Sequence, residues 1–528
     1  MNLLKTLTVG LVAAALPSMA FANPDPTIVH ICGSTAFRAP VTCAIINALG
    51  GTGCKAACNK SGTAPGNQNL LGGQAAIFAN GTVSYSGSTF TGNATIIVLA
   101  NWTGSLAGIL DVAAQNATLT YPNPADAAVE ASMQACDISP FGGGGTLPSS
   151  PAFSTVAAAP EVCMTDSFAS SAAAALASAQ VTAGHNIGGA TTGAGLKTLV
   201  NGAGLIEAGS ASTNIVGKGS STGYLGIVPF QWCIGNLSGA TFAAPTNITQ
   251  QTANYIIKNG AAPLSMFNTT STGTLSGADF VYLVGRNEDS GTRIAAFAEP
   301  QLSFSVNPQQ YLLTFSGGNK TGDIPAPTDF SFIGASTGTG AFVTGFDAWP
   351  QGATLNTEPF IHWTNAGFGH GGYAGGGDVS SVLSTPVNQS FPDPNGAALA
   401  GENTGKAFFI GYLGIADSGS FGNATKIIGG AALAYNGVTP SLAGINNGSY
   451  SFWSYEHMYY IGSGTHIVPG AIKTFADNLA DSLANVYVSY GSGGVVTTTS
   501  PAGVALLPQN TVGSVTRSVE GGGYTLNY

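Results

Sequence analysis

The stretch DFVYLVGRNEDSGTRIAAFA, from Asp279 to Ala298, decides the fold. Its first part, Asp279 to Val284, is short, apolar and rich in strand formers, which predicts a buried strand. A polar turn follows from Gly285 to Ser290, and the mostly apolar residues from Gly291 to Ala298 predict a helix. A strand, a turn and a helix in this order form the repeating unit of an α/β fold.

Two earlier segments repeat this pattern, again with hydroxyl side chains where the helix should begin. The strand, turn and helix are predicted at 27–32, 33–35 and 39–49 in the first segment, and at 94–100, 103–105 and 106–114 in the second. Glycine-rich stretches separate the apolar strands at 142–145, 184–204 and 367–377, and we expect them to be long surface loops or insertions. The sequence therefore predicts an α/β protein with Gly/Ser-rich insertions.

The composition excludes several classes of protein. Of 528 residues, 44% are hydrophobic and only 7% are charged, so the chain is not disordered through high charge and low hydrophobicity. The net charge is −10, with 14 Lys and Arg against 24 Asp and Glu and no cluster of cations. A protein that binds a nucleic-acid backbone needs such a cluster, so nucleic acid is not the expected partner.

The first 22 residues have the features of a signal peptide. Lys5 supplies the positive charge, residues 7–16 form a short and mostly apolar run, and Ala20-Phe21-Ala22 fits a cleavage site. We expect the mature chain to begin near Asn23 and to be periplasmic or secreted. Because no later apolar stretch reaches about 18 residues, we expect no membrane anchor.

The chain has seven cysteines, all in its first half. Export makes disulfide bonds plausible, and the odd number leaves at least one thiol unpaired. Cys54 and Cys58 could be half of a metal site, but no second pair or histidine follows at zinc spacing, so a structural bridge is favoured. Cys43 is close enough to join them in stapling one loop.

No motif of a known catalytic centre is present. The sequence lacks the H-E-x-x-H, G-x-S-x-G and G-x-x-x-x-G-K-[ST] patterns, and its six histidines show no ligand spacing. His457 is interpreted as a structural residue. We expect no enzyme activity, no metal and no cofactor.

The polar turn of the opening stretch predicts an anion site. The start of a helix offers unpaired backbone N–H groups, Ser290 and Thr292 add hydroxyl donors, and Arg286 adds a planar fork of donors. Glu288 can accept a hydrogen bond from an anion that carries a proton. Phosphate carries a proton at neutral pH, whereas sulfate does not. The alternative interpretation is a capping serine with a surface salt bridge.

Four motifs together resemble the phosphate-binding proteins of ABC transporters. They are GSTAFRAP at Gly33–Pro40, GSLAG at Gly104–Gly108, TDS at Thr165–Ser167 and RNEDSGT at Arg286–Thr292. The resemblance is spread over most of the mature chain but is confined to the motifs. The chain departs from the family pattern at Ala36, Leu106, Ala107 and Asp289.

The resemblance implies a set of ligand-binding residues and a fold. The residues are Ser34, Thr35, Phe37, Ser105, Asp166, Arg286, Glu288, Ser290, Gly291 and Thr292. The implied architecture is the two-lobed periplasmic-binding-protein fold of the second type. Residues 23–236 and 451–528 would form lobe I, and 237–450 would form lobe II, with crossovers near 228–236 and 450–453.

The implied function is capture of an inorganic oxyanion in the cleft between the lobes, with phosphate as the expected ligand. The partners would be that anion and the membrane subunits of an ABC transporter. The alternative from another class is an extracellular adhesive or matrix protein that keeps the fold. A phosphate-ester hydrolase on the same scaffold is a weaker option, because no metal ligands or placed nucleophile are visible.

Overall fold

The structure is a computed structural model that describes the chain in segments. These are residues 27–36, 41, 45, 54–58, 74–79, 83–85, 88–90, 96–124, 134–135, 154–176, 193–209, 224–235, 245–267, 280–287, 290–302, 308, 310–315, 331–332, 343–349, 372–373, 375–385, 407–418, 427, 430–485, 488–489 and 504–508. The predicted signal peptide and residues 142–145 lie outside these segments. Within them, no helix combines the length and the apolar character that crossing a membrane requires.

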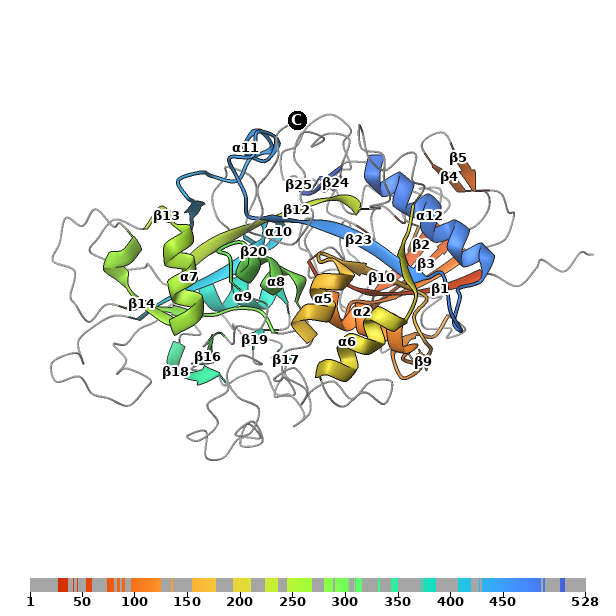
Figure 1. The fold of residues 1–528 in the computed structure, drawn as a ribbon, viewed down its shortest axis with the longest axis horizontal. Helices are drawn as coiled ribbons and strands as arrows, with labels where there is room; N and C mark the ends of the chain where they lie inside the picture. The colour runs from red at the N-terminus through yellow and green to blue at the C-terminus, as the bar shows by residue number, and fades with distance from the viewer. Residues whose placement is uncertain are drawn as a thin grey trace, which may run out of the picture.

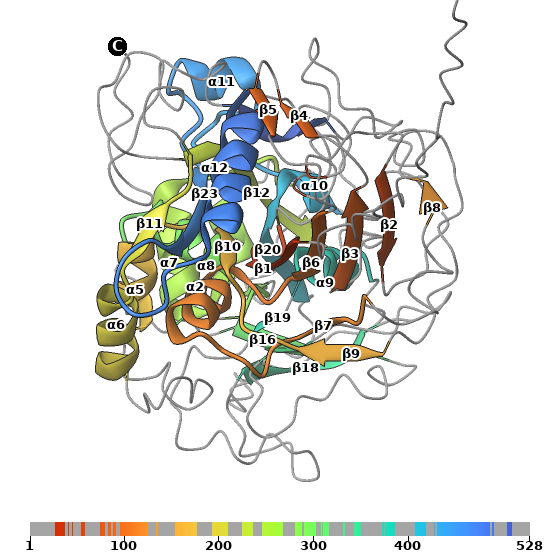
Figure 2. The same ribbon diagram turned by 90° about the vertical axis from the view of Figure 1, so that its right-hand side faces the viewer.

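One half of the molecule is built on parallel strands. The strand β1 (Thr27–Gly33) lies between β6 (Ile96–Asn101) and β10 (Val162–Thr165) and runs parallel to both. The strands β3 (Gln74–Ala79), β2 (Cys54–Cys58) and β8 (Gln134–Ala135) extend this sheet beyond β6 in antiparallel order. Figure 2 shows β1, β6, β3 and β2 side by side.

Helices cover both faces of these strands, as Figure 1 shows. The helices α2 (Ser105–Ala114), α5 (Ala169–Leu176) and α6 (Gly193–Gly202) lie on one face, and α12 (Gly470–Asn485) lies on the other. Alternate side chains of β1 pack against the helices on opposite faces of the sheet, because successive side chains of a strand point to opposite faces. Cys32 is buried with α2, α5 and α6, whereas Ile31 belongs to the core that includes α12.

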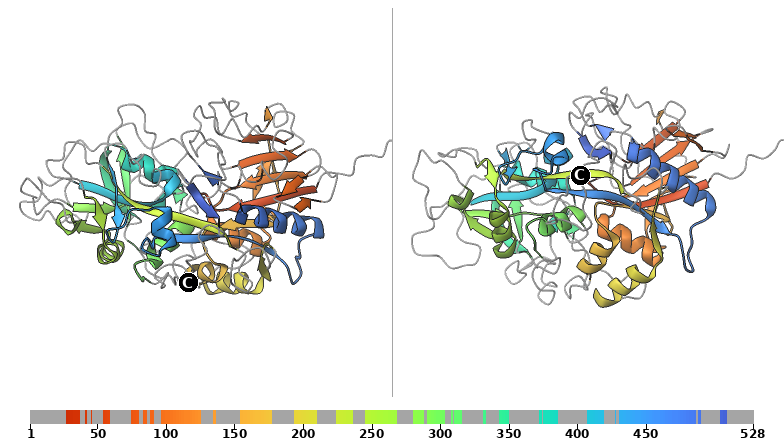
Figure 3. Two further views of the ribbon diagram at one scale, coloured as in Figure 1. Left: turned by 90° about the horizontal axis from the view of Figure 1, so that it is seen from above. Right: turned by 45° about the horizontal axis from the view of Figure 1, so that its top comes forward.

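Two long strands connect this half to the rest of the molecule. The strand β12 (Tyr224–Gly235) pairs along its first part with β23 (Trp453–Ile461) and along its second part, from Phe230, with β20 (Ala407–Gly414). Figures 1 and 3 show β12 and β23 running through the middle of an elongated molecule. The predicted crossovers near 228–236 and 450–453 fall on β12 and on the residues that lead into β23.

The other half again contains parallel strands. The strand β15 (Phe280–Leu283) is parallel to β20 and antiparallel to β14 (Ala261–Pro263). The helices α7 (Gln250–Asn259), α8 (Gly291–Ala298) and α9 (Gly376–Leu383) belong to this half.

The remaining elements are short or peripheral. They are β4 (Val83–Tyr85), β5 (Ser88–Phe90), β7 (Thr120–Pro122), β9 (Thr155–Ala157), β11 (Leu205–Glu207), β13 (Asn247–Ile248), the 3₁₀ helix η4 (Leu264–Phe267), β16 (Gln310–Phe315), β17 (Ser331–Phe332), β18 (Val343–Trp349), β19 (Gly372–Tyr373), α10 (Ile415–Ser418), β21 (Ala431–Ala432), β22 (Ala434–Tyr435), α11 (Leu442–Asn446), β24 (Val488–Ser489) and β25 (Val504–Pro508).

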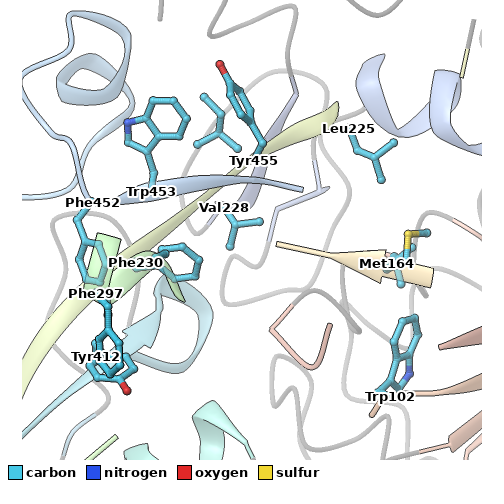
Figure 4. Packing of buried hydrophobic residues seen from close by; sticks show 14 of the residues in the cluster. Trp102, Met164, Leu225, Val228, Phe230, Phe297, Tyr412, Phe452, Trp453 and Tyr455 are labelled. Carbon is cyan, nitrogen blue, oxygen red and sulfur yellow. The ribbon is translucent and has the colours of Figure 1, made fainter. Parts of the chain in front are cut away.

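Large aromatic side chains fill the region where the long strands cross between the halves (Figure 4). Phe230 and Phe452 have ring centroids 5.5 Å apart, and Trp232 lies edge-on to Tyr412 at 5.4 Å. All four are buried. Aromatic pairs in such arrangements contribute about 0.5–1.5 kcal/mol beyond the area that they bury. The connection between the halves is therefore packed like the interior of a domain.

Predictions from strong local patterns are confirmed. The predicted helix at 291–298 is α8, and the predicted strand at 94–100 and helix at 106–114 are β6 and α2 within two residues at each end. The predicted helix at 39–49 lies largely outside the described segments, although Val41 and Ile45 are helical and buried within it.

The prediction of a loop at 184–204 is wrong for its second part, because residues 193–202 form α6. Leu196 and Val200 are four residues apart and therefore lie on one face of the helix, where both are buried against α2 and α5. The burial of these two side chains stabilises the helix more than the glycines at its ends destabilise it.

The predicted structural bridge among Cys43, Cys54 and Cys58 left the pairing open, and the structure excludes the pair Cys54–Cys58. The two residues lie at the ends of the strand β2, where an extended backbone separates their Cα atoms by about 13 Å. A disulfide bond needs a separation of about 4.4–6.8 Å. Cys32, Cys163 and Cys233 are free and buried.

Candidate functional site

The sequence-predicted binding residues within the described segments gather at the carboxyl ends of strands. Ser34 and Thr35 follow β1, Ser105 begins α2 after β6, and Asp166 follows β10. Arg286 follows β15 in the other half of the molecule. The parallel strands β1, β6 and β10 deliver their following loops to the same edge, which is where α/β proteins usually bind ligands.

The carboxylate of Asp166 joins the two halves of this cluster. It accepts a hydrogen bond from the Ser105 hydroxyl and another, at 3.2 Å, from Thr292 Oγ1 at the start of α8. All three side chains are buried. Ser105 and Asp166 come from one half of the molecule and Thr292 from the other, so the halves meet directly at this point.

Gly291 is the reason that α8 can approach so closely. A Cβ atom at this position would lie 1.8 Å from Asp166 Oδ1 and 2.9 Å from the Ser105 hydroxyl oxygen. No side chain larger than a hydrogen atom fits there without a shift. The next turn of α8 places Ile294 in the core formed by α2, α5 and α6, which extends the contact between the halves.

Arg286 is the central cation of the cluster and is 2% exposed. Its NH2 donates to Thr35 Oγ1 at 2.9 Å, and its Nε donates to the backbone carbonyl of Tyr373 at 3.1 Å. These two bonds fix the plane of the guanidinium group. Through the bond to Thr35, the side chain of Arg286 links the end of β15 to the turn after β1, across the junction between the halves.

Burial shifts the pKa of both charged groups toward the neutral form. The pKa of Asp166 is raised by burial, which the hydrogen bond from Ser105 and the charge of Arg286 oppose. The pKa of Arg286 is lowered by burial, which the charge of Asp166, followed by those of Asp417 and Asp378, opposes. Each charge therefore depends on the other for its stability in this dry environment.

A closed ring of hydrogen bonds holds the backbone of Arg286. Its N–H donates to the Tyr412 hydroxyl at 3.3 Å, that hydroxyl donates to Gln310 Oε1 at 3.0 Å, and Gln310 Nε2 donates back to the Arg286 carbonyl at 3.1 Å. Gly285 has no room for a side chain beside this ring. Sequence reasoning missed Tyr412 and Gln310, because neither lies in or near a recognisable motif.

The turn after β1 and the start of α2 are fixed to each other by the backbone. Gly33 has a φ of +121° and a carbonyl that accepts from Gly104 N–H at 2.8 Å. The N-cap of α2 is Gly104, so no side chain caps the first N–H groups of this helix. By contrast, the Ser290 hydroxyl at the start of α8 accepts from Arg293 N–H at 3.4 Å.

The arrangement can bind an anion through three kinds of donor. It has a buried guanidinium, hydroxyl groups from both halves, and the uncapped first turn of α2, where N–H groups and the helix dipole attract negative charge. Phe37 and Glu288, which the sequence also suggests, lie outside the described segments. Among the described residues, no group of three or more His, Cys, Asp or Glu is arranged to hold a metal ion.

His457, which the sequence predicts to be structural, lies on β23 and is fully buried beside the Arg286 cluster. Its Nδ1 lies 2.5 Å from Glu207 Oε1, and Glu207 also accepts from the Tyr459 hydroxyl at 3.0 Å. It pairs in register with Thr165, next to Asp166. Its partner could not be predicted from the sequence, since Glu207 is 250 residues away.

The solved structures that resemble this chain include proteins described as parts of phosphate transport systems. One is described as a phosphate ABC transporter substrate-binding protein from Clostridium perfringens with phosphate bound, at 12% identity, covering 86% of this chain and 93% of that chain with a TM-score of 0.34. An ABC-type phosphate transport receptor from Vibrio cholerae has 8% identity, coverages of 86% and 93% and a TM-score of 0.29. PstS from Borrelia burgdorferi has 10% identity, coverages of 87% and 92% and a TM-score of 0.27.

The chain aligns with them along most of its length. No family model and no curated protein matches the sequence. Because the TM-scores are below 0.5, the case for a function rests on the cluster around Arg286 and not on these likenesses.

Proposed function

We propose that this chain is an exported solute-binding protein that captures an inorganic oxyanion for uptake by an ABC transporter. Phosphate is the oxyanion that we expect it to bind. One observation carries the proposal. The buried guanidinium of Arg286 reaches from one half of the molecule to Thr35 in the other, two residues after Gly33, whose carbonyl accepts from Gly104 at the uncapped start of α2. A buried arginine at a helix N-terminus is a strong anion-binding combination, because the charge and the N–H groups act in a medium of low dielectric constant.

Asp166 gives the site a way to distinguish phosphate from sulfate. A carboxylate repels a fully ionised anion but accepts a hydrogen bond from one that carries a proton. Phosphate is protonated at neutral pH, whereas sulfate is not. Asp166 is held for this role by the Ser105 and Thr292 hydroxyls. In the sequence interpretation Glu288 has a similar role.

The two halves act as lobes in this proposal. Lobe I consists of residues 23–236 and 451–528, and lobe II of residues 237–450, with β12 and β23 as the connections. In the structure Ser34, Ser105, Asp166, Arg286, Ser290 and Thr292 are almost fully buried and Thr35 is half-buried, so an anion enters only when the lobes separate. Binding then favours the closed arrangement, because only that arrangement brings Arg286, Thr35 and Ser105 around the anion at once.

The proposal is tested by isothermal titration calorimetry of the mature chain with phosphate and with sulfate. We expect phosphate to bind more tightly. Arg286→Lys keeps the charge but loses the planar fork, so phosphate affinity should fall by roughly one to two orders of magnitude. Lys197→Gln, which removes an exposed cation from α6, is the matched control and should bind like the parent.

Two results would overturn the proposal. The first is that neither anion binds to the folded protein. The second is that Arg286→Lys binds phosphate like the parent. If Arg286→Lys does not fold, Thr35→Val removes the hydroxyl that Arg286 contacts while keeping the shape of the side chain, and it should weaken phosphate binding.

A further inference from the structure

A concave surface lies at the opposite end of α8 from the Arg286 cluster. It is a groove of about 460 Å³ between one face of α7 and the turn that follows α8. Five of the eight residues that line it carry a side-chain carboxamide, namely Gln250, Gln251, Asn254, Asn259 and Gln301. The volume is within the usual range of about 300–1,000 Å³ for sites that bind small molecules.

Two of these carboxamides are held in place by the facing turn. Asn254 Nδ2 donates to the carbonyl of Pro300 at 3.0 Å, and Gln250 Nε2 donates to the carbonyl of Glu299 at 3.4 Å. Each amide group is thereby oriented, and its oxygen is still able to accept hydrogen bonds. The polar groups of the groove are therefore partly preorganised, which lowers the entropy cost of binding.

Gln301 adopts a backbone conformation that is unfavourable for its residue type. Its φ is +61°, and its N–H donates to the carbonyl of Ala298 at 2.9 Å while Leu302 N–H donates to that of Phe297 at 3.0 Å. These two bonds form the standard helix-ending motif in which glycine normally occupies the left-handed position. A strained residue that could be glycine, and that lines a groove, indicates that the side chain is used.

The chemistry of the groove selects the kind of ligand. A carboxamide can donate and accept at once, which matches a hydroxyl group, and no carboxylate is among the lining residues. Tyr255 lines the same groove and is 41% exposed, so its ring offers an apolar face to the C–H face of a sugar. With Lys258 as the single charged lining residue, the groove suits a neutral ligand better than an ionic one.

We propose that this groove binds a neutral, hydroxyl-rich glycan. The site is distinct from the Arg286 cluster, and it gives the protein a second activity, attachment to a polysaccharide at the cell surface or outside the cell. Carboxamides from α7 and Gln301 bond the hydroxyl groups, and Tyr255 packs against one sugar ring.

Affinity electrophoresis in native gels tests this proposal, with dextran, laminarin, galactomannan and xylan as the embedded polysaccharides. We expect at least one of them to slow the migration of the parent protein. Tyr255→Ala should weaken that interaction roughly tenfold, since an aromatic contact is worth up to about 1.5 kcal/mol. Ile467→Ala, which removes an exposed apolar side chain before α12, is the matched control and should migrate like the parent.

Gln301→Gly separates a binding role from a structural one. Glycine fits the left-handed position without strain, so the variant should unfold at the same temperature as the parent or higher while its interaction with the polysaccharide weakens. Phosphate binding by calorimetry should be unchanged in both groove variants. No retardation by any of the four polysaccharides, or equal retardation of the parent, Tyr255→Ala and Gln301→Gly, would overturn the proposal.

Discussion

The two ends of α8 differ in almost every property that matters for binding. At its N-terminus, Gly291 and Thr292 lie against a buried carboxylate from the other half of the molecule. At its C-terminus, Gln301 lines an open groove in the same half, where Lys258 is the single charged lining residue. A helix of eight residues is only about 12 Å long. One short helix therefore connects a buried, charged cluster to an open groove whose lining is polar and carries one charge, that of Lys258.

The difference follows from what each end must do. At the N-terminal end, position 291 has no room for a side chain, and contact between the halves depends on glycine there. The C-terminal end has volume to spare and carries glutamine where glycine would be the less strained choice. Substitution should therefore harm function at the first end through added bulk and at the second end through lost side chain.

The largest effect is expected from Gly291→Ala. The added methyl group would collide with Asp166 Oδ1, so either α8 moves away or the carboxylate leaves its hydrogen bonds with Ser105 and Thr292. Overpacking of this kind costs about 1–3 kcal/mol, which corresponds to a roughly five- to hundredfold loss of phosphate affinity. Calorimetry measures it, with Gly470→Ala, which has open space around it, as the control. Unchanged phosphate affinity would show that contact at this end of α8 is not needed for binding.

Asp166→Asn should change both anion selectivity and the pH dependence of stability. Removing the carboxylate should shift the phosphate-to-sulfate affinity ratio toward sulfate by roughly tenfold, since a hydrogen bond to a charged group is worth about 1.5–3 kcal/mol. The competition of the two anions in one titration measures this ratio. A ratio that does not move would mean that Asp166 does not face the ligand.

The pH dependence follows from the raised pKa of Asp166. A carboxyl group whose pKa is higher in the folded chain than in the unfolded chain stabilises the fold below the unfolded value, and this contribution is lost as pH rises through the folded value. Without ligand, the unfolding temperature of Asp166→Asn should therefore rise relative to that of the parent as pH increases above about 4. A constant difference between the two proteins across that range would contradict the burial argument.

The parts of the site that sequence could predict are those with local signals. The helix at 291–298 has a capping serine, a glycine at its first position and an apolar run, all within nine residues. The resemblance of their motifs to the phosphate-binding proteins of ABC transporters placed Ser105, Asp166 and Arg286 in one site, and in the structure each follows a strand. The structure brings these residues together, while their role in binding stays a prediction.

The missed parts depend on contacts between distant segments. Tyr412 is 126 residues from Arg286, and it lies in a buried strand where an aromatic residue is ordinary. Gln310 opens another strand with no motif around it. The helix α6 was missed for a different reason, because its glycine-rich surroundings hid two buried apolar residues at helical spacing. The contacts of Tyr412 and Gln310 with Arg286 are not local in the sequence, whereas the spacing of Leu196 and Val200 is.

Tyr412→Phe should have a moderate effect on the charged end. The hydroxyl is lost, so the Arg286 N–H and Gln310 Oε1 both lose a partner inside the protein. Leaving buried polar groups unsatisfied costs about 1–3 kcal/mol, which should lower the unfolding temperature and weaken phosphate binding by several fold. Tyr255→Phe, an equally small change on the exposed face of α7, should leave both quantities unchanged. Full phosphate affinity in Tyr412→Phe would show that the ring of hydrogen bonds through Tyr412 and Gln310 does not position Arg286.

The smallest effect, and the only stabilising one, is expected from Gln301→Gly. A residue other than glycine in the left-handed conformation costs about 1–2 kcal/mol, and the added freedom of glycine in the unfolded chain offsets about 0.5–1 kcal/mol of the relief. The free energy of unfolding should therefore rise by roughly 0.5–1 kcal/mol, measured by urea denaturation at equilibrium. Gln251→Gly, inside α7, is the control and should lose about 1 kcal/mol, because glycine there only weakens the helix. A loss of stability in Gln301→Gly would mean that the glutamine side chain holds the turn together, and the contrast between the two ends of α8 would then be one of packing alone.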